Sequence, residues 1–203
     1  SCLVGSEMCI RDSIEEAGYS QEDMQDLTWE KYIEIGQAVK EKCGVDMCTL
    51  DPSDIGQIRM MMQSAGAWYS GENGEVTIAD NQALKDAIDV YKKLVESGCV
   101  KQISGWDPFV GAFNNGEVAS VVTGCWIAPS IQKAEDQSGK WAVAPFPKME
   151  ANSDSVNASS IGGAGWYVLK NVGHEEAAKD FLKNTFASNV DLMNQLAVDI
   201  TLV

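Results

Sequence analysis

The sequence predicts an α/β fold with a mixed sheet and flanking helices. Apolar residues at helical spacing alternate along the chain with short apolar runs that suit buried strands. This alternation is typical of sheets with partly parallel pairing. The chain has 203 residues, of which 45% are hydrophobic, enough to bury the core of one or two packed domains.

Capping residues mark two of the predicted helices. Residues 29–43 carry an apolar stripe that begins after Thr28 and stops at a glycine, as expected of an N-cap and a left-handed C-terminal position. Residues 84–95, which include Tyr91, carry the most regular apolar stripe, capped by Asp80 or Asn81 and closed by Gly98. The opposite face of this second helix is charged, which predicts that it is solvated.

A strand and a helix are predicted between these two helices. Residues 47–50 form a short apolar run, and the turn at residues 51–54 begins a helix that ends near Gly66. Further along, Asp107 followed by Pro108 predicts the start of a short helix with the acid as its N-cap.

Residues 118–123 are a short apolar run that suits a strand buried on both faces. Trp126 follows at a strand-to-helix junction, before a helix predicted at residues 127–136. In open α/β sheets, ligands bind at such junctions. The remaining predicted elements are a strand at 140–144, a loop at 150–160, a strand at 166–169 and helices at 175–187 and 190–198.

The chain is strongly acidic, with 15 basic and 30 acidic residues and a formal net charge of −15. Such a surface does not suit the neutralisation of phosphates, so we expect no nucleic-acid partner. The single histidine, His174, removes most histidine-based triads and metal sites, and we expect no cofactor and no metal. No apolar run approaches the roughly 20 residues that cross a bilayer.

Residues 1–13 resemble a translated sequencing-adapter tail and are predicted to be non-native. Four cysteines remain, and their spacing matches neither a zinc site nor a redox motif. Buried free thiols are the favoured interpretation, and a bridge between the first two stays open. The four are Cys43, Cys48, Cys99 and Cys125.

Six tryptophans are the most informative part of the composition. Trp29 lies on a periodic apolar face and Trp141 in an apolar strand, which predicts that both belong to the core. The other four each lie beside a glycine or at the end of an element, so a ligand-facing role and a packing role stay open for each. They are Trp68, Trp106, Trp126 and Trp166.

Flat aromatic side chains close to acidic and amide groups suit a sugar site. A pyranose offers an apolar C–H face for stacking and a hydroxyl rim that needs donors and acceptors. A cationic ligand is the alternative, because the same tryptophans can form an aromatic cage by cation–π attraction. The polar candidates are Asp51, Asp107, Asn114 and Asn157.

Several motifs occur in an order that identifies a family resemblance. They are TWEKY at 28–32, QSAGAW at 63–68, AFNNGEVA at 112–119, TGCW at 123–126, WAVAPFP at 141–147 and GGAGW at 162–166. This order resembles the family 1 extracellular solute-binding proteins, the maltodextrin-binding-protein-like carbohydrate-binding lipoproteins of bacterial ABC importers. The match runs from about Thr28 to the C-terminus, and the segment from 112 to 126 is its most specific part.

The resemblance implies a type II periplasmic-binding-protein-like lobe within an incomplete two-lobe architecture, since members of the family are roughly twice as long. Residues 14–165 would form the second lobe. Residues 166–203 would be a crossing strand and helices that belong to the first lobe. With companion segments absent, these last helices are predicted to expose apolar faces against which a second copy can pack.

The resemblance also implies roles for particular residues. Trp126 matches the tryptophan that stacks on a sugar ring, and Trp106 matches an aromatic residue that lines the cleft. Asp51 matches an acid that accepts hydrogen bonds from sugar hydroxyls, but Ser53 stands where the family has an aromatic residue. This departure argues against an inherited maltodextrin specificity. Trp68 and Trp166 have no such counterpart, and their candidacy depends on local context alone.

The predicted function is therefore an extracellular receptor that binds an oligosaccharide and delivers it to the permease of an ABC transporter. The resemblance implies that it is not an enzyme. It also implies anchoring through a lipoprotein N-terminus outside this chain, or a periplasmic location. Two alternatives stay open: a receptor for another solute, such as a peptide or a polyamine, and a glycosidase that uses two carboxylates.

Overall fold

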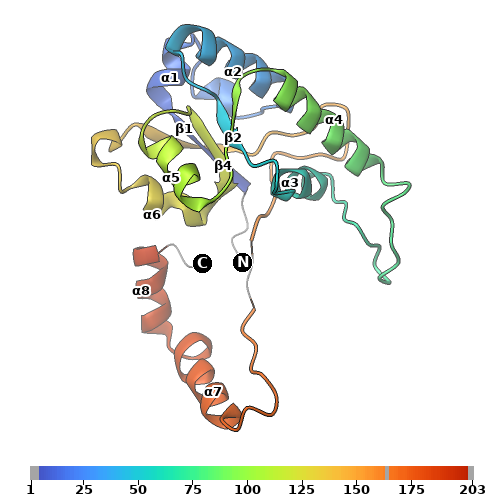
Figure 1. The fold of residues 1–203 in the computed structure, drawn as a ribbon, viewed down its shortest axis with the longest axis vertical. Helices are drawn as coiled ribbons and strands as arrows, with labels where there is room; N and C mark the ends of the chain where they lie inside the picture. The colour runs from blue at the N-terminus through green and yellow to red at the C-terminus, as the bar shows by residue number, and fades with distance from the viewer. Residues whose placement is uncertain (1–4, 163–164, 201–203) are drawn as a thin grey trace.

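The computed structural model describes residues 5–162 and 165–200, and the side chains of 11–162 and 165–197. Residues 5–162 form a body of strands and helices, and residues 165–200 form an arm that extends from it (Figure 1). We call these two parts the body and the arm.

The centre of the body is a three-stranded antiparallel sheet in the order β4-β1-β5. Strand β1 (Gly5–Ile10) pairs with β4 (Ser120–Gly124) on one side and with β5 (Trp141–Pro145) on the other. The middle strand thus comes from the segment that was predicted to be non-native. Its placement does not test that prediction, because many extended segments can satisfy the backbone groups of two flanking strands.

A parallel pair of strands completes the mixed arrangement. Strand β2 (Cys48–Leu50) pairs with β3 (Val100–Gln102), a strand that the sequence patterns did not indicate. A parallel bridge between Asp46 and Val118 joins this pair to the chain entering β4. Consequently β2, β3 and β4 point the same way, which confirms the predicted partly parallel pairing.

Helices cover both sides of these strands. On one side lie α1 (Arg11–Glu16), α2 (Trp29–Cys43), α3 (Gly56–Ser64) and α4 (Gln82–Glu96), preceded by a 3-10 turn at Glu22–Met24. On the other lie α5 (Trp106–Asn114) and α6 (Ala128–Ile131), with 3-10 turns at Cys125–Ile127 and Glu135–Gln137 (Figure 1). Strand β4 is buried throughout and separates two hydrophobic cores. Val122 packs in the larger core with α2, α3 and α4, and Val121 packs in the smaller core with α5 and α6.

Two predicted caps are confirmed at atomic detail. The Thr28 hydroxyl accepts a hydrogen bond from the Lys31 amide at 3.2 Å, and the Asn81 side chain accepts one from the Leu84 amide at 3.0 Å. Gly44 ends α2 in the left-handed region with φ 73°.

Two predicted boundaries are wrong. Helix α5 begins at Trp106, with Gly105 rather than Asp107 at the N-cap, because glycine adopts the φ of 95° found there. The helix predicted at residues 127–136 is divided into short turns: α6 ends at Ile131 and a separate 3-10 turn begins at Glu135.

The larger core is built around an aromatic cluster. Trp29 is fully buried and meets Tyr32 and Phe146 edge-to-face, with ring centroids 5.4 and 5.3 Å apart. Trp141 packs against the second core, and its indole donates to the Gln137 side chain at 2.8 Å. These placements agree with the predicted core roles of both tryptophans.

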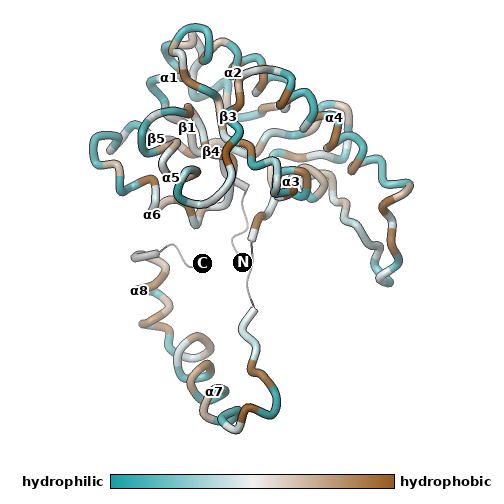
Figure 2. The backbone as a smooth tube through the Cα atoms, viewed as in Figure 1, coloured by the Kyte–Doolittle hydropathy of each residue, from teal (hydrophilic) through white to brown (hydrophobic). Residues whose placement is uncertain are grey.

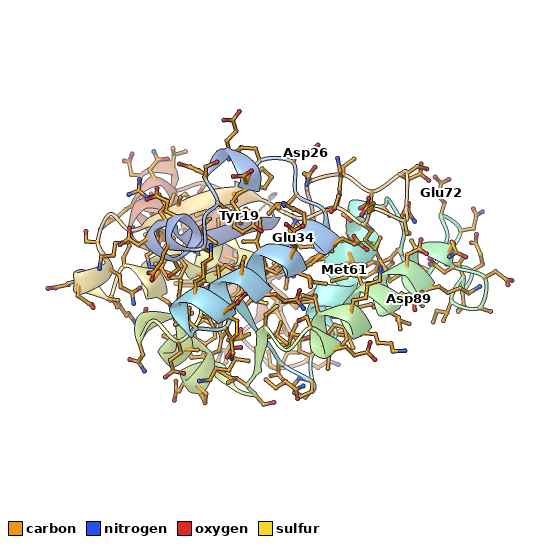
Figure 3. All side chains as sticks on the ribbon, turned by 90° about the horizontal axis from the view of Figure 1, so that it is seen from above. Tyr19, Asp26, Glu34, Met61, Glu72 and Asp89 are labelled. Carbon is orange, nitrogen blue, oxygen red and sulfur yellow. The ribbon has the colours of Figure 1, made fainter. Side chains whose placement is uncertain are left out.

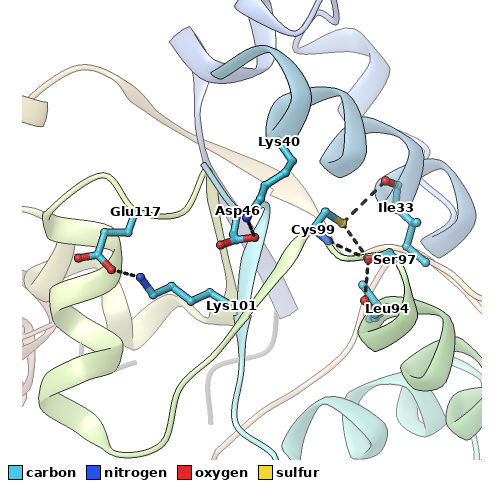
Figure 4. Close-up of polar contacts among 8 residues, drawn as sticks. All are labelled: Ile33, Lys40, Asp46, Leu94, Ser97, Cys99, Lys101 and Glu117. Carbon is cyan, nitrogen blue, oxygen red and sulfur yellow. Dashed lines mark hydrogen bonds and ion pairs between the residues drawn. The ribbon is translucent and has the colours of Figure 1, made fainter. Parts of the chain in front are cut away.

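Ionic and thiol contacts lie around the parallel strands. Lys40 pairs with Asp46 at 2.6 Å, and Lys101 pairs with Glu117 (Figure 4). The Cys99 thiol lies 3.0 Å from the Ser97 hydroxyl, and burial raises its pKa. Cys43 and Cys99 are free thiols, and no disulfide joins Cys43 to Cys48, so the bridge left open between these two does not form. Cys125 is disulfide-bonded, so the expectation of a free thiol at that position is wrong.

The acidity of the chain is spread over its surface. The outward-pointing Asp26, Glu34, Glu72 and Asp89 come from two helices and two connecting segments (Figure 3). None of the helices described in 11–162 and 165–200 has the length and apolar character needed to cross a membrane.

The arm consists of α7 (Glu175–Leu182), a π-helical turn (Lys183–Ala187) and α8 (Val190–Ile200). Neither α7 nor the turn has a buried residue, and apolar segments are visible along the arm in Figure 2. Residues 166–169 do not form the predicted strand, because a strand needs a hydrogen-bonded neighbour and none is paired with this segment in the part of the arm that is described.

Candidate functional site

A pocket of about 290 Å³ lies where β2, β3 and β4 reach their carboxyl ends. Its walls come from the segments that follow β2 and β3, from α3 and α4, and from the end of β4. The lining residues are Thr49, Leu50, Asp51, Asp54, Gly56, Gln57, Met60, Tyr91, Ile103, Gly105, Trp106, Phe109, Val122, Thr123, Trp126 and Ile161.

Two of the predicted tryptophans form one wall of this pocket. The rings of Trp106 and Trp126 lie 5.8 Å apart between centroids, at an interplanar angle of 30°. Trp106 opens α5 and is 53% exposed, whereas Trp126 lies in the turn after β4 and is half-buried. Phe109 extends the wall, with its ring 5.9 Å from that of Trp106. Partly exposed rings at this spacing offer a broad apolar surface to a ligand.

Gly124 has no side chain, and the Trp126 ring occupies the space that a side chain would fill. A Cβ atom added to Gly124 would lie 2.6 Å from Trp126 Nε1 and 2.7 Å from its Cδ1, closer than real Cβ contacts. The absence of a side chain at the end of β4 therefore allows the indole to lie against the strand.

Asp51 supplies an ionised carboxylate to the pocket. Its Oδ1 accepts hydrogen bonds from the Ser53 hydroxyl at 2.6 Å, the Ser53 amide at 2.9 Å and the Ser104 hydroxyl at 2.8 Å. These bonds, that of the Ser53 hydroxyl first, lower the pKa of Asp51 from 3.8 to about 2. The carboxylate thereby ties the loop after β2 to the loop after β3. Among the described residues, Oδ2 accepts a single long bond, from the Gly105 amide at 3.4 Å, and it retains capacity for a ligand donor.

Several lining residues escaped the sequence analysis. Tyr91 was assigned to the apolar face of its helix, but it also borders the pocket, and burial together with the charges of Asp51 and Asp54 raises its pKa. Its hydroxyl is thus protonated at neutral pH and can donate. Asp54 precedes α3 and Gln57 lies in its first turn. Both lie in the segment that follows β2, and that position was the available signal.

Trp68 and Trp166 do not line the pocket. Trp68 is 41% exposed and lies against Tyr69, with ring centroids 4.9 Å apart. Trp166 is 68% exposed and stacks on Phe186 in the arm at 4.7 Å. The structure therefore brings together three of the five predicted site residues, Asp51, Trp106 and Trp126, and leaves the other two elsewhere.

The other polar candidates also lie outside the pocket. The Asn157 amide donates to the backbone carbonyls of Leu27 and Phe146 at 2.7 and 2.9 Å, which is a structural role. Asp107 and Asn114 are absent from the lining. Within the described residues, no group of three or more histidine, cysteine, aspartate or glutamate side chains could hold a metal ion.

The pocket thus combines an apolar platform with a rim of hydrogen-bond acceptors and a tyrosine donor. This combination suits a ligand with an apolar face and several hydroxyl groups. It does not suit an acid catalyst at Asp51, because a general acid needs a raised pKa and that of Asp51 is lowered.

The chain is similar to proteins of known family. Residues 8–202 match the family described as bacterial extracellular solute-binding protein. A lactose-binding protein of Rhizobium radiobacter is 40% identical over 188 residues, which are 93% of this chain and 44% of that protein. An arabinooligosaccharide-binding protein of Bacillus subtilis (strain 168) is 26% identical, again over 93% of this chain and 44% of the relative.

Solved structures share the architecture. The GacH receptor of Streptomyces glaucescens, solved unliganded and with acarbose, superposes with a TM-score of 0.75 at 22% identity, over 98% of this chain and 50% of that one. The maltose-bound MalE3 of T. maritima gives a TM-score of 0.76 at 20% identity, over 98% and 51%. The chain spans about half the length of the proteins that it matches.

Proposed function

This chain belongs to the bacterial extracellular solute-binding proteins, and from that premise we propose that it is one lobe of a sugar receptor for an ABC importer. The observation that carries the proposal is the pocket in which Trp106 and Trp126 lie beside the ionised Asp51. A sugar ring can stack on the indoles while its hydroxyl groups donate to the carboxylate. The relatives named for lactose and arabinooligosaccharide favour a neutral saccharide.

The receptor works by closing around its ligand. Since the chain spans 44% of the lactose-binding relative, the remainder of the longer protein would supply the opposite wall of the site. Sugar that contacts both walls binds the closed form more tightly and shifts the population toward it. The closed form then presents the solute to the permease, and no chemical step is required of the protein.

In this role, the body and the arm belong to different lobes of the receptor. Residues 14–165 form the second lobe, and residues 166–203 cross into the first lobe. The arm accordingly carries apolar residues with no partner in the body, including Trp166 and Phe181. The receptor is extracellular and held at the membrane by a lipid anchor on a segment outside this chain, or it is periplasmic.

A binding experiment on the full-length receptor tests the proposal. Trp126→Ala should weaken saccharide binding by at least about 1 to 2 kcal/mol, because it removes half of the stacking platform. Trp68→Ala is the matched control, since Trp68 is exposed but lies outside the pocket. Isothermal titration calorimetry with lactose measures both variants, and equal affinities for wild type and Trp126→Ala would contradict the proposal.

A cationic solute is the second candidate. Asp51 and Asp54 both line the pocket beside the aromatic wall, and carboxylates with indole faces also recognise ammonium groups. Titration of the receptor's tryptophan fluorescence with lactose and with spermidine separates the two candidates. A response to spermidine alone would favour the cationic ligand.

A further inference from the structure

Gln57 stands out among the polar residues of the pocket. It lies in the first turn of α3 and lines the wall together with Asp51 and Asp54. Its side-chain carbonyl oxygen is buried and has no hydrogen-bond partner, and no hydrogen bond joins its amide nitrogen to another described residue. The whole amide is thus unpaired within the part of the chain that the structure describes.

The neighbouring carboxylates of Asp51 and Asp54, unlike Gln57, accept hydrogen bonds from the protein. Asp51 Oδ1 accepts from Ser53 and Ser104, and Asp54 Oδ1 accepts from the Gly56 amide at 2.8 Å. These bonds hold the loop before α3 in place. Gln57 takes no part in them, and no hydrogen bond within the described residues explains a polar group at this position.

An unpaired buried carbonyl raises the free energy of the ligand-free protein, because the group has lost water without gaining a partner. Three other buried side-chain atoms of the described residues also lack a partner, but none of their residues lines the pocket. They are Trp29 Nε1, Glu30 Oε2 and Asn114 Oδ1. Gln57 is the one among these four whose missing partner can arrive with a ligand.

The chemistry of the amide defines that partner. A primary amide carries both a donor and an acceptor. A sugar hydroxyl also both donates and accepts. An ammonium group only donates, and an apolar ligand does neither.

We infer that Gln57 is a specificity-determining residue, whose amide turns toward the pocket and pairs with one hydroxyl group of the bound saccharide. This inference rests on the proposed function of the pocket. The pairing removes the unfavourable state of the free side chain, so it adds to affinity without any role in holding the fold together.

Substitution of Gln57 by methionine tests the inference in the full-length receptor. Methionine keeps the length of the side chain and removes both hydrogen-bonding groups. Lactose affinity should fall about 3- to 10-fold, the range expected for one hydrogen bond. The melting temperature without ligand should stay level or rise, because an unpaired buried polar group has been replaced by an apolar one. Gln63→Met, an exposed position on the same helix, is the matched control and should leave affinity unchanged.

A series of monodeoxy lactoses identifies the contact directly. For wild type, removal of one particular hydroxyl should cost about 3- to 10-fold in affinity, and this cost should disappear in Gln57→Met. Wild-type affinity in Gln57→Met, a parallel fall in affinity and melting temperature, or a deoxy penalty that persists in the variant would each overturn the inference. If wild type itself binds no saccharide, the proposed function fails and the role of Gln57 fails with it.

Discussion

At the scale of single residues, the site depends on where a side chain lies relative to a strand end. Asp51 directly follows β2 and Trp126 lies two residues after β4, and both positions could be predicted from the sequence. Trp68 and Trp166 have similar glycine neighbours but lie elsewhere, because a neighbouring glycine indicates local exposure and not the direction of a distant pocket. Gln57 and Tyr91 were missed because their positions in helices resemble ordinary surface and core positions.

The hydrogen bonds of Asp51 predict a pH dependence of stability. Its pKa of about 2 in the folded protein lies below the ordinary 3.8, so its stabilising effect is present above about pH 4 and is lost as the pH falls toward 2. Asp51→Asn should therefore lower the urea midpoint at pH 6 and lower it less at pH 3. Urea titrations at the two pH values measure this difference.

Asp89→Asn provides the comparison for that experiment, since Asp89 is exposed on α4 and makes no hydrogen bond to the described residues. It should show a smaller difference between the two pH values. If Asp51→Asn lowered the urea midpoint equally at pH 6 and at pH 3, the prediction would be contradicted. The charge of the Asp51 carboxylate would then not contribute to stability.

At the scale of elements, local sequence signals were sufficient to predict a helix whose ends are set by its own residues. The caps of α2 and α4 are such signals: Thr28 was predicted outright, and Asn81 was one of two predicted candidates. Strands β1 and β3 were not predicted, because each is a short segment that becomes a strand only by pairing with residues far along the chain. Helix α5 shows the limit of a local signal: Asp107 and Pro108 lie in its first turn, where an unpaired backbone amide is ordinary and proline is tolerated.

The junction after β4 predicts the effect of a small substitution. Gly124→Ala should displace the Trp126 ring, because the added methyl group would lie within 3 Å of the indole. Saccharide affinity of the full-length receptor should fall by several-fold, on the order of one lost aromatic contact. Gly111→Ala is the control, since its added Cβ meets its nearest atom at 3.8 Å. Calorimetry compares the two, and equal affinity would show that the ring tolerates the alanine.

At the scale of the whole molecule, the arm exposes apolar side chains that the body does not cover. Apolar side chains of the arm, among them Tyr167 and Leu169, are exposed, and the helices α7 and α8 are joined to each other through the π-helical turn. Apolar surface of this kind is usually covered by another part of the protein or by another molecule. The sequence resemblance predicted exposed apolar faces on the last helices, and the exposed Phe181 and Val190 agree with it.

The exposed arm predicts self-association of the isolated chain. The 203-residue chain should show a molar mass that rises with concentration in light scattering coupled to size-exclusion chromatography. Removal of residues 165–203 should abolish the rise, because the apolar surface is removed while the body keeps its own core. A monomeric mass for the full 203-residue chain at all concentrations would contradict this prediction.

The indole N–H signals of the six tryptophans in the 203-residue chain provide the most direct test of the sugar site. Because the chain spans only 44% of the lactose-binding relative, we expect weak binding, and a millimolar affinity corresponds to about −4 kcal/mol. Heteronuclear NMR during a lactose titration to about 50 mM detects binding of this strength. The signals of Trp106 and Trp126 should shift together along one binding curve. Those of Trp29, Trp68, Trp141 and Trp166 should stay in place. Shifts confined to the other tryptophans, or no shift at all, would contradict a saccharide site at Trp106, Trp126 and Asp51.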